Sequence, residues 1–230
     1  MTWTPVTLRG QLVRLEPLSR EHLGGLIEAT EDGRMWERWY TSVADPDGMA
    51  AAVEKWLTWQ DEGFMLPFVT VRQADDVVLG MTTFYDPQWG VPRVSVGHTW
   101  NRASTHRTGT NAESKLLLMT HAFEELGCRC VRYETSWANQ QSRAAIERLG
   151  ARLDGVLRAD RLERNGALRD TVVYSVLEHE WPSVKAGLEA RVARRVRSRC
   201  AGTTWCCGRP GPSARAAPIG TPRPACPPAR

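Results

Sequence analysis

The chain has 230 residues, of which 42% are apolar and 24% charged, a composition typical of a globular protein with one domain, or one domain and an appendage. No apolar run approaches the roughly 18 residues that cross a membrane, and Met1-Thr-Trp-Thr-Pro5 has no signal-peptide character, so we expect a cytoplasmic protein without a membrane span. The net charge of +4 is uneven: residues 189–230 hold nine Arg and one Glu, a surplus of +8, so residues 1–188 carry about −4 and show no nucleic-acid footprint.

The first part of the chain predicts a strand followed by helices. Residues 12–18 alternate apolar and polar side chains, which is the period of a strand with one buried face. Ser19 can cap a helix that runs to about Thr30. Asp45 starts a further helix, and its apolar stripe includes Trp56, which we interpret as a core residue.

Three strands are predicted next, at residues 65–72, 77–85 and 94–100. The first two are joined by a turn at Asp75-Asp76. The third has Gly97 at its centre, and a glycine inside a strand suggests a bulge or a close approach of another group to the backbone.

A loop from His106 to Asn111 leads directly into a helical pattern over residues 112–126. The first turn of a helix has unpaired backbone N–H groups and a partial positive charge, so it suits a phosphate. Gly109 would let a diphosphate approach those groups closely. The alternative interpretation is an ordinary helix cap at Thr108 or Thr110.

The remainder of the body alternates strands and helices, which predicts a mixed sheet with helices on its faces. The Asn165-Gly166 dipeptide between two of these strands indicates a two-residue type I′ hairpin. The elements are expected at residues 130–135 (strand), 139–149 (helix), 152–164 and 169–177 (strands), and 181–196 (helix).

The composition changes beyond about Arg199, where Pro, Gly, Ala and Arg dominate without a hydrophobic period. We therefore divide the chain into a domain at residues 1–198 and a tail at residues 199–230. We expect the tail to be disordered and without essential function, and RNA binding by its arginines is the alternative. Cys128 and Cys130 belong to no CxxC pair, so we expect no metal site.

Several segments carry a resemblance through their order and spacing. They are Arg107-Thr-Gly-Thr-Asn-Ala-Glu-Ser-Lys-Leu-Leu-Leu, His121-Ala-Phe-Glu-Glu-Leu-Gly, Asn139-x-x-Ser142-Arg-x-Ala-Ile-x-Arg-Leu-Gly-Ala, Asp154-Gly-Val-Leu-Arg158 and Glu180-Trp-Pro182. Together they resemble the GNAT acyltransferase superfamily, and more narrowly its RimJ/RimL-type branch, whose best-known members acetylate the N-termini of ribosomal proteins. The resemblance runs from about Leu8 to Leu188. It implies the α+β (α/β) GNAT acyl-CoA N-acyltransferase fold, with a mixed, mostly antiparallel sheet of about seven strands splayed in the middle and helices on both faces.

The resemblance implies acetyl-CoA as acyl donor, with its pantetheine arm between strands 94–100 and 130–135 and its diphosphate on the loop before residue 112. His106 and Asn111 depart from the superfamily's phosphate-loop pattern, and Arg107 could supply the charge instead. Backbone N–H groups of residues 96–99 would stabilise the tetrahedral oxyanion. The cofactor-binding residues expected on this basis are Val96, His98, Thr99, Arg107, Thr108, Gly109, Thr110, Asn111, Asn139 and Ser142.

For catalysis, the resemblance points to Ser142, Asn139 and His98. The tyrosine that protonates the leaving sulfur in many relatives is absent here, so the acid is Ser142, a water, or no group at all. Asn139 would cap its helix and hold the pantetheine or a water. Many relatives have a glutamate on the splayed strand where this chain has Ser95, so His98 or a water relay would take the proton of the amine. A structural role for His98 is the alternative.

We therefore expect an acyl-CoA-dependent N-acyltransferase that moves acetyl from acetyl-CoA to a primary amine, either a protein N-terminal α-amine or a small molecule, by direct attack on the thioester. At pH 7, deprotonation costs about 4.6 kcal/mol for an amine of pKa near 10.4 and about 1.1 kcal/mol for an α-amine near 7.8. A site without an evident carboxylate favours the α-amine. The alternative is a CoA-binding sensor or interaction module that has lost catalysis. A homodimer is compatible with the resemblance; a metal and a membrane partner are not expected.

Overall fold

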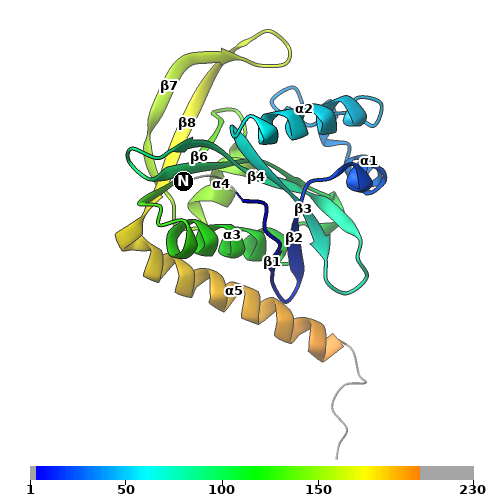
Figure 1. Cartoon of the computed structure of the whole chain (residues 1–230), viewed down its shortest axis with the longest axis vertical. Helices are drawn as coiled ribbons and strands as arrows, with labels where there is room; N and C mark the ends of the chain where they lie inside the picture. The colour runs from blue at the N-terminus through cyan, green and yellow to red at the C-terminus, as the bar shows by residue number, and fades with distance from the viewer. Residues whose placement is uncertain (1–3, 203–230) are drawn as a thin grey trace, which may run out of the picture.

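The computed structural model describes residues 4–202, which form one eight-stranded sheet in the order β1-β2-β3-β4-β5-β6-β8-β7 (Figure 1). All neighbouring strands are antiparallel except β5 and β6, which are parallel. The strands are β1 (Leu8–Arg9), β2 (Val13–Pro17), β3 (Met65–Arg72), β4 (Val78–Gln88), β5 (Arg93–Asn101), β6 (Cys130–Ser136), β7 (Arg152–Leu162) and β8 (Leu168–Leu177).

Helices cover both faces of this sheet, with α1 and α2 on one face and α3 and α5 on the other (Figure 1). The α2 helix buries an apolar stripe of Met49, Val53 and Trp56, which are spaced as one helical face. The predicted core position of Trp56 is therefore confirmed. The α-helices are α1 (Leu23–Glu31), α2 (Met49–Asp61), α3 (Thr110–Thr120), α4 (Gln140–Glu147) and α5 (Trp181–Gly202), and α3 continues into a π-helical turn, His121–Glu125.

The expected fold class is confirmed, with two differences in extent. The sheet has eight strands instead of about seven, because β1 is only two residues long and too short to give a periodic signal. The last helix continues to Gly202, beyond the expected end at residue 196 and the boundary drawn at residue 198. The remainder of the predicted tail, residues 203–230, lies outside the described residues, so its disorder stays a prediction.

The prediction of a two-residue type I′ hairpin was wrong. Strands β7 and β8 are joined by residues 163–167, in which the Glu163 N–H donates to the Ala167 carbonyl at 2.8 Å. A type I′ turn needs positive φ at both central residues, but only Gly166 has it (φ 81°) and Asn165 does not. Instead, the Asn165 side chain accepts the Ala167 N–H at 3.1 Å, which stabilises a longer turn.

One buried carboxylate anchors the start of the sheet to α3. Glu113 is 2% exposed, and its oxygens accept the backbone N–H groups of Gln11, Leu12 and Val13 at 2.8, 2.7 and 2.7 Å. A Cβ at Gly10 would lie 2.5 Å from the Glu113 carboxyl carbon, so only glycine fits there. This contact fixes the first turn of α3 against the β1–β2 connection.

Among the helices within residues 4–202, none combines the length and apolar character that crossing a membrane requires.

Candidate functional site

The central feature of the site is the divergence of β5 and β6. The two strands pair only from Arg93 with Cys130 to Val96 with Tyr133, although each continues for several residues beyond. Opposite this point the β4–β5 register shifts by one residue, and His98 has a positive φ of 45°. The bulge predicted near Gly97 is therefore confirmed. Another group also approaches the backbone closely here, because a Cβ at Gly97 would lie 2.7 Å from the Tyr85 ring.

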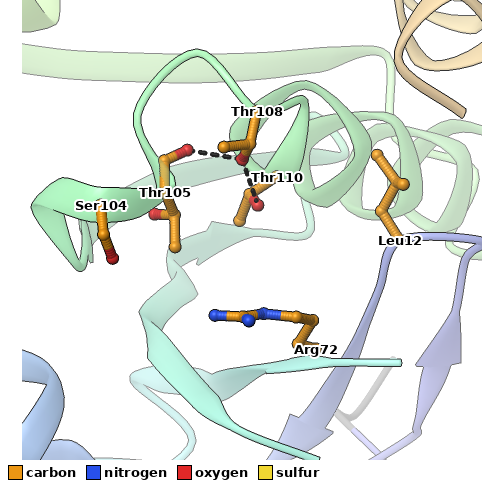
Figure 2. Close-up of a pocket in the computed structure, with 6 residues that line it drawn as sticks. All are labelled: Leu12, Arg72, Ser104, Thr105, Thr108 and Thr110. Carbon is orange, nitrogen blue, oxygen red and sulfur yellow. Dashed lines mark hydrogen bonds between the residues drawn. The ribbon is translucent and has the colours of Figure 1, made fainter. Parts of the chain in front are cut away.

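A cleft of about 1920 Å³ lies at this divergence. It is also lined by the segment around Met35 and Tyr40. Eight of the ten expected site residues line it: Val96, His98, Thr99, Arg107, Gly109, Asn111, Asn139 and Ser142. The remaining two, Thr108 and Thr110, have side chains that line a separate pocket of about 260 Å³ with Arg72, whose guanidinium extends into it (Figure 2).

The predicted phosphate loop ends in a helix N-terminus that no side chain caps within the described chain. The N-cap residue is Gly109, with φ 102°, and Arg107 also has positive φ, 63°. The Thr108 hydroxyl donates to the Thr105 carbonyl at 2.6 Å and contacts the Thr110 hydroxyl at 3.0 Å, so neither threonine caps α3 (Figure 2). The capping interpretation is thus not realised, and the first-turn N–H groups of α3 stay available to an anion.

The second predicted helix start also has the expected geometry. The Asn139 side-chain oxygen accepts the Ser142 backbone N–H at 3.0 Å, which caps α4. Both residues line the cleft, with the Ser142 side chain half-buried. The capping role of Asn139 is confirmed, whereas its contact with pantetheine and the acid role of Ser142 stay predictions.

His98 lies at the cleft wall between two aromatic rings. Its ring centroid is 5.5 Å from Tyr85 and 6.5 Å from Trp59. Partial desolvation lowers the pKa of His98, and the positive charges of Arg161, Lys55 and Arg169 add to this effect. A histidine with a lowered pKa is neutral at pH 7 and is a weak proton acceptor. Its role as base stays a prediction.

The cleft is also lined by two carboxylates, Glu134 and Glu163, which the sequence analysis did not identify. Arg161 forms an ion pair with Glu134 at 2.8 Å, so the charge of that carboxylate is already balanced. Glu163 is 8% exposed, accepts the Ser136 hydroxyl at 2.5 Å and forms no ion pair within residues 4–202. The site therefore contains a carboxylate without a cationic partner among the described residues. This carboxylate belongs to the β7–β8 turn, whose type was predicted wrongly.

A buried lysine, Lys115 of α3, also lines the cleft. It is 4% exposed, and its ammonium donates to the hydroxyls of Thr99 at 2.6 Å and Thr82 at 2.9 Å, with no carboxylate in ion-pair distance among the described residues. Desolvation lowers the pKa of Lys115 to about 7. A signal for this burial existed in the sequence: Lys115, Leu118, Met119 and Ala122 share one helical face.

Lys115→Met is expected to remove a pH dependence of stability. Between pH 7 and 9 the unfolded chain keeps this lysine protonated, whereas the folded protein releases the proton, so the free energy of unfolding rises with pH. Below pH 7 both states are protonated and the contribution is flat. The rise is about 2 kcal/mol over this window. Urea unfolding at pH 7, 8 and 9 measures it, with Lys55→Met at an exposed lysine of α2 as control. Parallel profiles for Lys115→Met and the unchanged protein would contradict this assignment.

A buried donor completes the lining of the cleft. Tyr133, 2% exposed, pairs with Val96 at the last rung before the strands part, and its hydroxyl has no hydrogen-bond partner among the described residues. Burial raises the pKa of Tyr133, so the hydroxyl remains a neutral donor. The cleft thus combines parting parallel strands, an uncapped helix N-terminus and buried polar groups. This arrangement suits an elongated, phosphate-bearing ligand that lies across the sheet.

The comparisons with known proteins agree with this class. The family described as "Acetyltransferase (GNAT) domain" matches residues 13–152. YdaF of Bacillus subtilis (strain 168), described as a candidate ribosomal N-acetyltransferase, is 32% identical over 111 residues, which are 48% of this chain and 60% of YdaF. A candidate acetyltransferase from T. thermophilus is 34% identical with a TM-score of 0.71, over 84% of this chain and 100% of that one. Mycobacterium smegmatis RimJ, in complex with CoA-disulfide, is 23% identical with a TM-score of 0.69, over 83% and 96% of the two chains.

This chain belongs to the GNAT acetyltransferase family, because the family match covers more than half of it. The resemblance proposed from its motifs is confirmed, including its RimJ/RimL-type neighbours. It is a GNAT-family N-acetyltransferase, a family that uses acyl-CoA.

Proposed function

We propose that the protein transfers acetyl from acetyl-CoA to a primary amine, and that the preferred acceptor is an α-amine. The observation that carries this proposal is the separation of β5 from β6 beyond Val96 and Tyr133, in a cleft that reaches the uncapped N-terminus of α3. Such a cleft can hold a diphosphate at the helix and a thioester between the strands. The RimJ structure in complex with CoA-disulfide supports the same ligand here.

In the proposed reaction the amine attacks the thioester carbonyl directly. The new carbon–nitrogen bond forms as backbone N–H groups near His98 stabilise the oxyanion, and the carbon–sulfur bond then breaks. Glu163 receives the amine proton, directly or through one water, because it is the cleft carboxylate without a cationic partner. The CoA thiolate takes a proton from Ser142 or from water.

Two considerations support an α-amine as acceptor. Its proton costs about 3.5 kcal/mol less to remove at pH 7 than that of a lysine side chain. YdaF is described as a candidate ribosomal N-acetyltransferase, which is a protein-directed activity. The absence of a carboxylate no longer supports an α-amine, because Glu163 lines the cleft. The preference for an α-amine therefore rests on the cost of deprotonation and on this relative.

The test is an acceptor screen with the full chain. Acetyl-CoA is incubated with N-terminal peptides, their N-blocked forms that keep a lysine, polyamines and aminoglycosides, and thiol release and the mass of each acceptor are measured. Free N-terminal peptides should gain acetyl, and the blocked forms should not. Acetylation confined to small amines would refute the α-amine preference. CoA binding without thiol release from any acceptor would favour the catalytically degraded sensor.

A further inference from the structure

A stripe of arginines on α5 faces the phosphate end of the cleft. Arg191, Arg194 and Arg195 line the cleft together with Ser198, at positions that share one face of a helix. The stripe is about 10 Å long at the rise of an α-helix. The neighbouring apolar stripe of α5, which includes Leu188 and Val192, is buried. The fold therefore presents one face of α5 to the core and the other to the ligand cleft.

This stripe lies directly beside the helix N-terminus expected to hold the diphosphate. The stem of Arg195 packs on Gly109, where a Cβ would lie 3.0 Å from the Arg195 Cγ. The guanidinium of Arg191 donates to the carbonyl of Arg148, which closes α4 and also lines the cleft. Arg107 adds a further cation from the loop. Three elements thus place five arginines around one end of the cleft.

None of these five arginines forms an ion pair with an acidic residue of the described chain. The residues outside that part contain no Asp or Glu either. Burial lowers the pKa of Arg191, and the nearby charges of Arg148 and Arg194 act in the same direction. Like charges held together without a counter-charge favour an anionic ligand.

The diphosphate of an acyl-CoA needs only part of this charge, because the first-turn N–H groups of α3 and the Arg107 side chain are expected to bind it. The remaining anionic group of CoA is the phosphomonoester on its ribose, which carries about −1.5 to −2 charges at pH 7. Guanidinium groups bind such a phosphate with paired hydrogen bonds. We infer that Arg194 and Arg195 of α5 bind the ribose 3′-phosphate and so select free CoA thioesters over donors that lack it, an inference that rests on the proposed use of acyl-CoA.

Isothermal titration of the full chain with CoA and with dephospho-CoA, at constant ionic strength, tests this inference. Three proteins are compared: the unchanged chain, the double variant Arg194→Gln/Arg195→Gln, and Arg197→Gln. Glutamine keeps part of the aliphatic stem, and Arg197 is an exposed arginine of the same helix that does not line the cleft. Thermal unfolding confirms that each variant is folded.

The unchanged chain should bind CoA at least about tenfold more tightly than dephospho-CoA. The double variant should lose this difference through weaker CoA binding, with dephospho-CoA binding little changed, and Arg197→Gln should keep it. Equal binding of the two ligands by the unchanged chain would overturn the inference and leave the proposed function intact. Equal weakening of both ligands in the double variant would overturn it too, since that indicates general attraction. Binding of neither ligand would reject the proposed function itself.

Discussion

Glu163→Gln is expected to lower kcat for acetyl transfer by about 10²- to 10³-fold, which lies within the range for loss of a general base. Glutamine has the shape of glutamate and can still accept the Ser136 hydroxyl, so the turn at residues 163–167 should keep its structure. It cannot receive a proton from the amine. The affinity for acetyl-CoA should stay within about twofold, because Glu163 is proposed to act on the acceptor.

Steady-state kinetics across pH 6 to 9, with thiol release as readout, checks this expectation. Glu134→Gln is the matched comparison, since Glu134 lines the same cleft but is paired with Arg161. Its loss should be much smaller than that of Glu163→Gln. Equal losses in the two variants, or a loss below tenfold in Glu163→Gln, would remove Glu163 from the role of base.

Glu113→Gln is expected to destabilise the fold by about 3 kcal/mol or more, a large part of the stability of a domain this size. The carboxylate accepts three backbone N–H groups, of which those of Leu12 and Val13 are buried. An amide replaces one acceptor oxygen with an N–H₂ group. At least one buried donor then faces another donor and loses its hydrogen bond.

Urea unfolding at pH 7 measures this effect through the shift in midpoint at constant slope. Glu125→Gln is the matched control, because Glu125 is an exposed carboxylate in the continuation of the same helix, and it should change stability by less than about 0.5 kcal/mol. A Glu113→Gln protein within about 1 kcal/mol of the unchanged chain would show that the anchor of β2 on α3 is dispensable. Binding of CoA to the folded fraction should persist.

Sequence patterns located most of the helices and strands and much of the site, because those features depend on interactions over a few residues. The alternation in β2 and the stripe of α2 reflect the period of each element. Asn139 caps α4 through a contact three residues away. The loop before α3 could be predicted for the same reason, because Gly109 both permits the turn and occupies the N-cap position of the helix.

Tertiary structure decided which side chains meet in the cleft. Glu163 reaches Ser136 across 27 positions of sequence, and it does so because the turn after β7 is longer than Asn165-Gly166 suggested. The hydrogen bonds from Lys115 to the hydroxyls of Thr82 and Thr99 form only when α3 packs against β4 and β5. A local period can show which face of a helix is buried, but the partners of a buried side chain follow from how whole elements pack.

The sequence by itself thus determined the family, the order of the elements and the loop suited to a phosphate, all of which are encoded in short-range spacing. Only the tertiary structure placed the carboxylate of Glu163 and the arginine face of α5 in one cleft. The physical reason is that these contacts join residues far apart in the chain, and their geometry is set by the packing of α5 on α3 and of the β7–β8 hairpin beside β6.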